Sequence, residues 1–517
     1  MSGEIHYFRV PKRDWRQRLA KLKDAGLDAV STYIPWNWHE VSPGVFDFKG
    51  DTVEERDLET FLEYVQEEDL FVLAKPGPYI CAEWENGGIP GWLIKKHPEI
   101  LARNFKGKPT FWFSKKFPVI TYLHPVYLNH VKNWFKNVAS ILSRYQYEKG
   151  GNIILVQIDN ESSYGFHFWP FDTDYNDVVI GTRTEEGLYQ KWLRERYQSV
   201  EELNRRYHLH FDSFSSVEPP RRMVKDNRFL PWIFDWMEFK EDMIARFLGE
   251  LASVLRSSGI DVPLYTNEPY NFLSPASISK KSKVVFDTID LYPQLIYDIE
   301  SLTEVVNNIE RLKAEQPNSA PLALELQAGW FNSKVPDNMV HFLERLAYIH
   351  GLKGFNFYMF SGGINPEGYG TTGRTYYHDA PLDEGGRETS KYSIIKRFTD
   401  FLNASQTGTI GIRKGKRKLA EVNLGYYQPY TYVRFVSLKS SLIGYRALFR
   451  LMEKFISVVL EAGFNFELVD LRQASIEKLF KIPVHYVFSF DFMDRAVVKK
   501  LVAYVENGGV LIMLPCV

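Results

Sequence analysis

The sequence predicts an α/β protein in which a (β/α)8 TIM barrel is followed by a smaller, doubly wound α/β domain of the flavodoxin-like type. Three observations lead to this prediction. The 517 residues are too many for one ordinary core but suit a large domain followed by a small one. Short apolar runs alternate with amphipathic stretches up to about residue 405. A polar stretch then separates this pattern from a second, shorter one of the same kind.

Eight apolar runs in the first 405 residues have the length and composition of buried parallel strands. Helical spacing between them completes the repeated unit: Trp15, Leu19 and Leu22, for example, mark one face of a helix that ends at Gly26. The connections after Ala82 and between residues 162 and 260 are long, as the loops that build the active face of a barrel often are. The eight predicted strands are 4–8, 27–34, 70–74, 153–158, 263–266, 288–292, 322–326 and 354–358.

We therefore assign residues 1–405 to the barrel, 406–430 to a linker and 431–517 to the second domain. In the second domain, strands are predicted at 464–469, 484–490 and 510–514, with helices between them. The last predicted strand lies at the end of the sequence, and an isolated domain should not leave such an open edge. We expect the second domain to be incomplete and the barrel to lack a lead-in to its first strand.

Composition excludes several classes of partner. The 63 basic and 64 acidic residues give a net charge of −1, so no basic field for nucleic acid exists. There is neither an apolar run long enough for a membrane nor a signal-peptide stretch, which predicts a cytoplasmic protein without a membrane partner. Cys81 and Cys516 are the two cysteines, too few for a disulfide framework or a cysteine zinc site. We expect no metal and no cofactor.

Aromatic residues make up 15% of the chain, which suits a large aromatic core or a cleft that binds the apolar faces of a sugar. Glu161 and Glu325 end the fourth and seventh predicted strands, which lie opposite one another across the barrel. Two carboxyl groups about 5–5.5 Å apart are the apparatus of a retaining glycosidase: one protonates the leaving oxygen and the other attacks the anomeric carbon. Taken singly, either glutamate suits a structural role as well.

Three residues near these strand ends suit a bound sugar. Asn160 can hydrogen-bond the hydroxyl beside the anomeric carbon. The indole of Trp330 can stack on a sugar ring, although it suits an apolar core equally well. The rigid segment 75–84, rich in Pro and Gly, brings Glu83 to the same mouth, where a carboxylate can accept hydrogen bonds from two sugar hydroxyls.

Short segments of the barrel form an ordered set, and no single motif is as specific as the whole set. One of them holds Glu325 and is followed by Gly-Trp-Phe at 329–331. The other segments are SGEIHYFR (2–9), TYIPWNWHE (32–40), PGPYICAEW (76–84), GGIPGWL (87–93), QIDNE (157–161), YMFSGGIN (358–365) and DAPL (379–382). In this order, over nearly the whole barrel, the segments resemble glycoside hydrolase family 35.

The resemblance implies that Glu161 is the acid/base and Glu325 the nucleophile. Tyr292, at the end of the sixth predicted strand, is a further candidate for orienting the nucleophile, and a rim aromatic is the alternative for it. Lys75 stands where the family typically has arginine. The resemblance also implies a pocket for the terminal sugar lined by Tyr33, Cys81, Ala82, Glu83, Asn160 and Tyr358.

The part after the barrel lacks the β-rich domains usual in family 35. It resembles the α/β domain of family 42 β-galactosidases, which takes part in subunit assembly, so a homo-oligomer such as a dimer is expected if that domain is complete. A family 35 barrel with this second domain resembles the archaeal exo-β-D-glucosaminidases, which remove glucosamine from chitosan oligosaccharides. Most of family 35, by contrast, are β-galactosidases.

Two observations disagree about the sugar. A charged amine at C2 calls for a carboxylate, whereas Asn160 is neutral, and strand alternation points Asp159 away from its face. The domain order favours glucosamine, and we give it slightly more weight. The expected function is a retaining exo-β-glycosidase for oligosaccharides, leaning to exo-β-D-glucosaminidase, with β-D-galactosidase as the alternative.

Two other interpretations stay open. In the first interpretation, the chain is a sugar-binding protein made inactive by truncation. The presence of both Glu161 and Glu325 argues against it. In the second interpretation, the chain is a glycosidase of the same clan as family 35 that acts inside long polysaccharides. The long loops argue against it, because they suit a walled pocket for a chain end.

Overall fold

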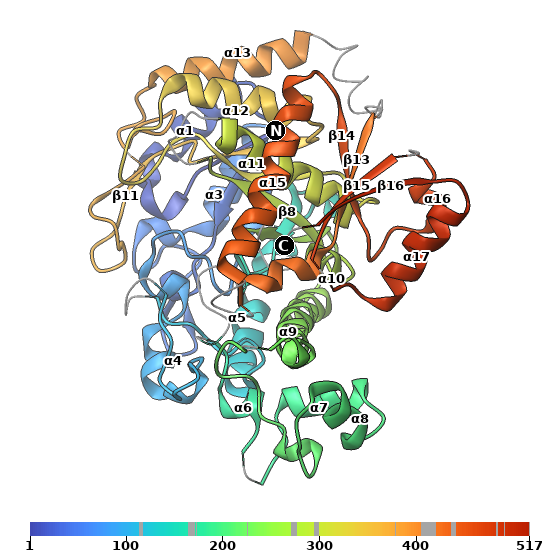
Figure 1. Cartoon of the computed structure of the whole chain (residues 1–517). Coiled ribbons are helices and arrows are strands. Elements are labelled where there is room, and N and C mark those ends of the chain that lie inside the picture. Colours follow the sequence, from blue (N-terminus) through green and yellow to red (C-terminus); the bar gives the residue numbers. More distant parts are fainter. Residues whose placement is uncertain are drawn as a thin grey trace.

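Eight parallel strands form a closed barrel, which confirms the predicted fold class (Figure 1). In this computed structural model the order around the barrel is β1-β10-β9-β8-β7-β6-β5-β2, so the strands follow the chain once around. The structure describes residues 1–112, 117–163, 171, 173–182, 184–224, 226–269, 277–293, 299–377, 379–404, 420–435, 441–481, 484–490 and 492–515. The barrel strands are β1 (Ser2–Glu4), β2 (Ala29–Tyr33), β5 (Phe71–Lys75), β6 (Ile153–Gln157), β7 (Leu264–Glu268), β8 (Phe286–Leu291), β9 (Leu322–Gln327) and β10 (Gly354–Tyr358).

The first strand begins earlier and is shorter than the sequence pattern predicts. β1 ends at Glu4, and Tyr7–Arg9 form a short 3-10 helix instead of continuing the predicted strand 4–8. The apolar residues of this segment are buried over the end of the barrel, so their pattern reflects burial and not sheet pairing. β1 pairs with β10 on one side and with β2 on the other, and this pairing closes the barrel.

Each barrel strand is followed by at least one helix. The apolar residues of α3, for example, form one buried stripe, and the Asp57 side chain caps this helix by accepting a hydrogen bond from the backbone N–H of Thr60. The helices of the eight repeats are α1 (Trp15–Asp24), α3 (Leu58–Glu67), α5 (Pro125–Leu142), α9 (Leu230–Ser257), α10 (Ile278–Lys281), α11 (Ile299–Glu315), α12 (Asp337–Ile349) and α13 (Ser390–Ala404).

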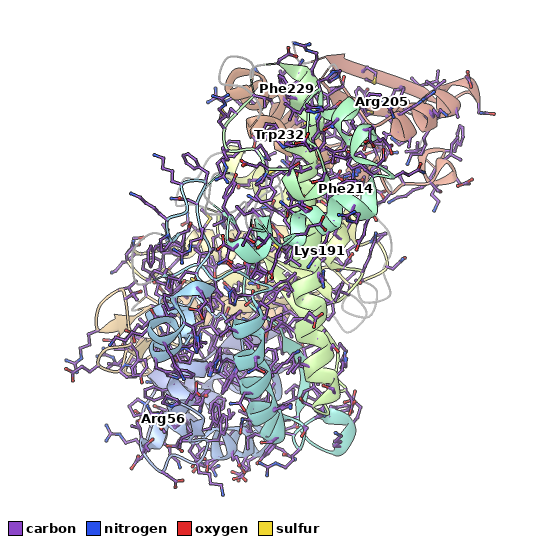
Figure 2. All side chains as sticks on the ribbon, turned by 90° about the horizontal axis from the view of Figure 1, so that it is seen from below. Arg56, Lys191, Arg205, Phe214, Phe229 and Trp232 are labelled. Atoms are coloured by element: carbon purple, nitrogen blue, oxygen red, sulfur yellow. The ribbon has the colours of Figure 1, made fainter. Side chains whose placement is uncertain are left out.

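The two long connections that the sequence predicts extend from the C-terminal ends of β5 and β6. Figure 1 shows their helices at the lower end of the molecule, away from α13. Figure 2 labels Phe214 and Trp232 in this region, far from Arg56 at the other side of the barrel. The connections therefore stand at the mouth where catalytic residues of such barrels gather. Their helices are α4 (Gly91–Lys96), α6 (Asp177–Ile180), α7 (Leu188–Arg196) and α8 (Val200–Tyr207).

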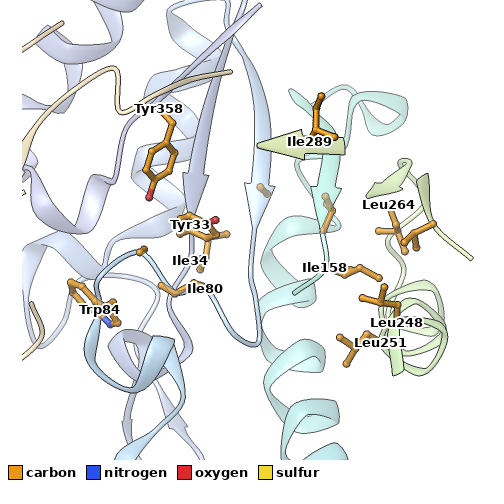
Figure 3. Packing of buried hydrophobic residues seen from close by; sticks show 14 of the residues in the cluster. Tyr33, Ile34, Ile80, Trp84, Ile158, Leu248, Leu251, Leu264, Ile289 and Tyr358 are labelled. Carbon is orange, nitrogen blue, oxygen red and sulfur yellow. The ribbon is translucent and has the colours of Figure 1, made fainter. Parts of the chain in front are cut away.

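Many of the aromatic side chains lie in the hydrophobic core. Five tryptophans are among the largest fully buried side chains, which agrees with one of the two interpretations of the composition. Figure 3 shows Ile158 facing Leu248 and Leu251 of α9 in this core, and Tyr33 beside Tyr358. The same cluster thus includes two tyrosines that the sequence places in the candidate pocket. The five tryptophans are Trp15, Trp36, Trp84, Trp134 and Trp236.

A second sheet of four parallel strands follows the barrel, in the order β14-β13-β15-β16. This order corresponds to 2-1-3-4 along the chain, as in flavodoxin-like folds. The helices α15 (Ser441–Glu461), α16 (Ile476–Leu479) and α17 (Arg495–Glu506) connect the strands. The strands are β13 (Val422–Tyr426), β14 (Phe466–Asp470), β15 (Val484–Ser489) and β16 (Val510–Pro515).

The predicted linker at 406–430 is wrong in its second half, because it contains β13. This strand pairs with β14 on one side and β15 on the other, so it is central to the sheet. The asparagine and glycine within Val422–Tyr426 hide the strand from a hydropathy pattern. Gly425 fits tightly here, since a Cβ on it would lie 2.7 Å from Cγ2 of Val487. Residues 406–419 of the predicted linker lie outside the described part.

Polar contacts join the second domain to the outside of the barrel. The Arg472 guanidinium donates to Glu238 of α9 at 3.0 Å, and the Gln428 amide donates to Glu241 of the same helix at 2.8 Å. The hydroxyls of Thr303 in α11 and Ser457 in α15 are 3.0 Å apart.

Across the described ranges, no helix combines the length and hydrophobicity needed to cross a membrane.

Candidate active site

Glu325 lies near the end of β9, buried, with a tyrosine hydroxyl at each carboxylate oxygen. Tyr33, at the end of β2, lies 2.9 Å from Oε1, and Tyr292, just after β8, donates to Oε2 at 2.5 Å. Burial raises the pKa of Glu325, whereas the Lys75 ammonium and the two hydroxyls act in the opposite direction. The pKa of Glu325 is raised overall, and these partners limit the rise because they favour the charged form of the carboxyl.

Glu161 follows β6 at the same mouth, in a strained turn. The φ angles of Asp159 and Glu161 are +57° and +50°, a region that residues other than glycine seldom adopt and that is often found at functional sites. Burial, followed by the charges of Glu325 and Glu83, raises the pKa of Glu161 well above its ordinary value. A protonated Glu161 opposite an ionised Glu325 can act as an acid beside a nucleophile.

An amide network fixes the orientation of Asn160. The backbone N–H of Glu161 donates to Oδ1 of Asn267 at 3.0 Å, so Nδ2 of Asn267 lies on the other side of its amide. That nitrogen donates to Oδ1 of Asn160 at 3.0 Å and to Oδ2 of Asp290 at 2.7 Å. Gln157 donates to the same Asn160 oxygen at 3.2 Å. Nδ2 of Asn160, which bonds to none of the described residues, is therefore left as a free donor.

The segment around Glu83 forms another part of the site. Cys81, Ala82 and Glu83 are consecutive residues with φ between +45° and +51°. Arg9 holds this turn by donating to the backbone oxygen of Ala82 at 2.7 Å. The Tyr376 hydroxyl donates to Oε2 of Glu83 at 2.6 Å. A half-buried carboxylate and a turn held in strain are what a precise sugar-binding wall needs.

Aromatic rings complete the site. The Tyr292 and Trp330 rings meet edge to face at 5.3 Å between centroids, and Tyr292 and Tyr358 do so at 6.3 Å. The Tyr358 hydroxyl is 3.0 Å from that of Tyr376, which leads to Glu83. The Tyr33 hydroxyl lies 2.5 Å from Oδ1 of Asn160 as well as 2.9 Å from Glu325, so it joins the two halves of the site. The ten residues that the sequence singled out therefore lie around one site.

A model described as Glycosyl hydrolases family 35 matches residues 1–206, and one described as GLMA-like, second domain, matches residues 437–517. A beta-1,2-glucosyltransferase of Ignavibacterium album is 32% identical over 551 residues, which cover 100% of this chain and 74% of that protein. The chain belongs to glycosyl hydrolases family 35.

Other family 35 relatives carry different names. An exo-beta-D-glucosaminidase of Pyrococcus horikoshii is 35% identical over 537 residues, covering 99% of this chain and 66% of that protein. The chain thus spans just under two thirds of the length of this relative. A beta-galactosidase of Mus musculus is 32% identical over 282 residues, covering 51% of this chain and 40% of that protein.

The solved structure of a beta-galactosidase from the haloarchaeon Halorubrum lacusprofundi has a TM-score of 0.78. It is 16% identical and the match covers 99% of this chain and 72% of that one. At this identity the likeness concerns the fold, and it includes both the barrel and the second domain.

Asn267, Asp290 and Tyr376 also belong to the candidate site, although they were not among the ten residues predicted from the sequence. Asp290 and Asn267 lie in β8 and β7, and the rule that selected Glu161 and Glu325 applies to them too, because both are polar residues near strand ends. Tyr376 lies in the short strand β12 (Thr375–Tyr376), which no sequence pattern predicted.

Lys75, in place of the family's usual arginine, is fully buried at the end of β5. Its ammonium is 2.7 Å from Oε2 of Glu4 and 4.2 Å from the centre of the Tyr33 ring. We expect Lys75→Met to raise the pKa of Glu325, because a cation that favours the ionised carboxyl is lost. Activity that needs ionised Glu325 disappears as the pH falls through this pKa. The acidic limb of kcat/KM should therefore move to higher pH.

Lys75→Arg is the control for this prediction, since it keeps the charge and should leave the acidic limb in place. Breaking a buried ion pair costs about 3–5 kcal/mol, so circular dichroism and thermal unfolding must first show that the Lys75→Met protein is folded. An acidic limb at the same pH in all three proteins would contradict a role of Lys75 in setting the charge of Glu325.

Proposed function

We propose that the chain is a retaining, exo-acting β-glycosidase with Glu325 as its nucleophile and Glu161 as its acid/base. The observation that carries this proposal is the contrast between the two carboxyls. Glu325 accepts from Tyr292, lies 2.9 Å from the Tyr33 hydroxyl and has a nearby ammonium, whereas burial and neighbouring negative charges raise the pKa of Glu161 well above its ordinary value. This is the division of roles that a double displacement requires.

In the first step, Glu325 attacks the anomeric carbon while Glu161 gives its proton to the departing glycosidic oxygen. In the second step, ionised Glu161 takes a proton from water, and that water releases the sugar from Glu325. Tyr33 and Tyr292 hold the carboxylate of Glu325 in place for the attack. The positions of Cys81, Ala82 and Glu83, together with the long connections after β5 and β6, support a walled pocket for one terminal sugar.

We place the C2 substituent of that sugar at Asn160. Its oxygen is surrounded by donors, so it presents Nδ2, a donor, to the ligand. A C2 hydroxyl accepts such a hydrogen bond, whereas an ammonium has no lone pair to accept it. Asp159 does not supply the missing carboxylate, because its oxygens accept from the Ser162 hydroxyl at 2.5 Å and the Tyr79 backbone N–H at 3.2 Å. The geometry therefore favours a neutral terminal sugar, and we propose a β-D-galactoside.

Exo-β-D-glucosaminidase, which the domain order favoured in the sequence analysis, is the second candidate. It is supported by the Pyrococcus relative, which resembles the chain through the barrel and the second domain alike. An inactive sugar-binding protein has less support, because β1 pairs on both sides and the two carboxyls have distinct environments.

A panel of nitrophenyl glycosides tests these candidates on one preparation. We expect turnover of the β-galactoside to exceed that of the β-glucosaminide, with the β-glucoside as the third substrate. The reverse ratio would favour the glucosaminidase. Chromatography of the products with added oligosaccharide separates hydrolysis from sugar transfer, the activity in the name of the Ignavibacterium relative. An absence of turnover with every substrate would contradict the proposed function.

The variant Asn160→Asp tests the assignment of the C2 position. The new carboxylate keeps an oxygen for Asn267 and Gln157 and offers the other to the ligand, where it suits an ammonium and not a hydroxyl. We expect kcat/KM for the galactoside to fall by about 10²-fold or more, because a polar mismatch in a buried site is costly. The ratio of glucosaminide to galactoside turnover should rise. Asp159→Asn is the matched control and should leave this ratio unchanged.

A further inference from the structure

Arg9 is a buried cation beside the candidate site, and neither proposed step uses it. It is the last residue of the short 3-10 helix that follows β1, and only 2% of its surface is exposed. It forms no ion pair with a residue that the structure describes. Burying a charge without a partner carboxylate is costly, so other contacts have to compensate for this cost.

Each of the three guanidinium nitrogens of Arg9 donates to a different residue. Nε donates to Oδ1 of Asn365 at 2.7 Å, and one terminal nitrogen donates to the backbone oxygen of Ala82 at 2.7 Å. The other terminal nitrogen lies 2.5 Å from Nδ1 of His6, which accepts because an arginine can only donate. These acceptors follow β1, β5 and β10, which lie near one another in the barrel order β10-β1-β2-β5. Arg9 thus ties together three loops at the mouth of the barrel.

One of these contacts restrains the strained turn of the sugar-binding wall. Residues 81–83 have φ angles between +45° and +51°, and such a conformation persists only when its surroundings fix the backbone. Arg9 fixes the oxygen of Ala82 from one side. From the other side, the backbone N–H and the hydroxyl of Thr371 both donate to the backbone oxygen of Glu83 at 2.9 Å. The loop that contains Thr371 is the same one that Arg9 binds through Asn365.

Tyr376 connects Arg9 to the side chain of Glu83. The guanidinium lies over the Tyr376 ring, 3.8 Å from its centre, and the Tyr376 hydroxyl donates to Oε2 of Glu83 at 2.6 Å. A cation over an aromatic face draws electron density from the ring, which makes the hydroxyl a stronger donor. Burial raises the pKa of Glu83, and the Tyr376 hydroxyl and the Arg9 charge act against this rise. Oε1 of Glu83 accepts from none of the described residues, so it remains an acceptor for a sugar hydroxyl.

We infer that Arg9 is a positioning residue for the terminal sugar: by holding the turn at 81–83 and the Tyr376 ring, it keeps the Glu83 carboxylate where a sugar hydroxyl can donate to it. This inference rests on the proposed function, in which Glu83 belongs to the wall of the sugar pocket. The hydrogen bonds of Arg9 reach neither Glu161 nor Glu325. Loss of Arg9 should therefore weaken sugar binding more than it slows the chemical steps.

The variant Arg9→Lys tests the inference. An ammonium keeps the positive charge, but it is a single point that cannot reach all three acceptors of the planar guanidinium. We expect KM to rise about tenfold, the size of a buried hydrogen bond to a charged group, while kcat falls by less than about threefold. Both constants are measured with the nitrophenyl glycoside that the wild-type protein turns over fastest. An unchanged KM in the folded variant would overturn the inference and leave the proposed function intact.

Arg18→Lys is the matched control. Arg18 is also a fully buried arginine, and it donates to a backbone oxygen, that of Glu384, at 3.0 Å. It lies in α1, outside the candidate site. The kinetic constants of this variant should therefore equal those of the wild-type protein, and circular dichroism shows whether both variants are folded. If Arg9→Lys does not fold, Arg9→Gln replaces it, with the same expected change and the same refuting result.

Coupling to Glu83 separates this role from a merely structural one. Residues that act through one another are not additive, whereas independent losses of packing multiply. Glu83→Gln should itself raise KM, and adding Arg9→Lys to it should raise KM by less than about twofold more. Tyr376→Phe, which keeps the ring under Arg9 and removes the hydroxyl, should show the same lack of additivity with Glu83→Gln. A further tenfold rise of KM in the Arg9 and Glu83 double variant would contradict the inference.

Binding of isopropyl thio-β-D-galactoside, whose sulfur link resists hydrolysis, keeps the inference separate from the proposed function. If the wild-type protein turns over no glycoside but binds this compound, the proposed function fails, and weaker binding by Arg9→Lys in calorimetry would uphold the inference. Equal binding by the two proteins would refute it. A wild-type protein that neither turns over a glycoside nor binds the thiogalactoside would refute both.

Discussion

Replacing Glu325 with alanine is expected to lower kcat by about 10⁴-fold or more, the size of loss that follows removal of one member of a concerted catalytic set. Without the carboxylate no covalent bond to the anomeric carbon can form, and Tyr33 and Tyr292 lose their shared acceptor. Turnover of a nitrophenyl glycoside measures the loss. Circular dichroism shows whether the variant is folded.

Added azide tests whether Glu325 acts as the nucleophile. In the Glu325→Ala protein, the space left by the carboxyl admits azide on the face from which the nucleophile attacks. The product should be a glycosyl azide with the configuration inverted relative to the β-glycoside. Detection of the retained anomer, or rates near those of the wild-type protein, would show that Glu325 is not the nucleophile.

Replacing Glu161 with alanine is expected to produce the second largest loss, about 10²–10⁴-fold, which is the range of general acid–base catalysis. The loss should depend on the leaving group. Alkyl glycosides need the proton that Glu161 holds, whereas dinitrophenyl glycosides leave without it. Parallel assays with both kinds of substrate measure this dependence, and equal losses with the two would contradict an acid role.

Azide again distinguishes the two carboxyls. In the Glu161→Ala protein the sugar still becomes attached to Glu325, and azide then attacks from the side that Glu161 occupied. The expected product is a glycosyl azide of retained configuration, and the rate should rise with azide concentration. Glu161→Gln is the control: it fills the space without ionising, so azide should rescue it less.

Much of the barrel could be predicted from the sequence, because its information is local. Continuous apolar runs such as the first four residues of Phe71–Lys75 are typical of strands buried on both faces, and amphipathic stretches such as Leu58–Glu67 are typical of helices outside a barrel. The prediction failed where local signals mislead. The segment 4–8 is apolar because it is buried, and β13 contains Asn423 and Gly425 although it is central to its sheet.

The sequence by itself determined the fold class, the ten candidate site residues and the family, because each depends on residue types at fixed places along the chain. Tertiary structure alone decided the partners of those residues. The orientation of the Asn160 amide depends on Asn267, which is 107 residues away, and the place of Asp290 opposite Glu325 depends on a register shift between β8 and β9 in the closed barrel. Charge and hydrogen bonding act through space, so the preference for a neutral sugar could be inferred only once the barrel had closed.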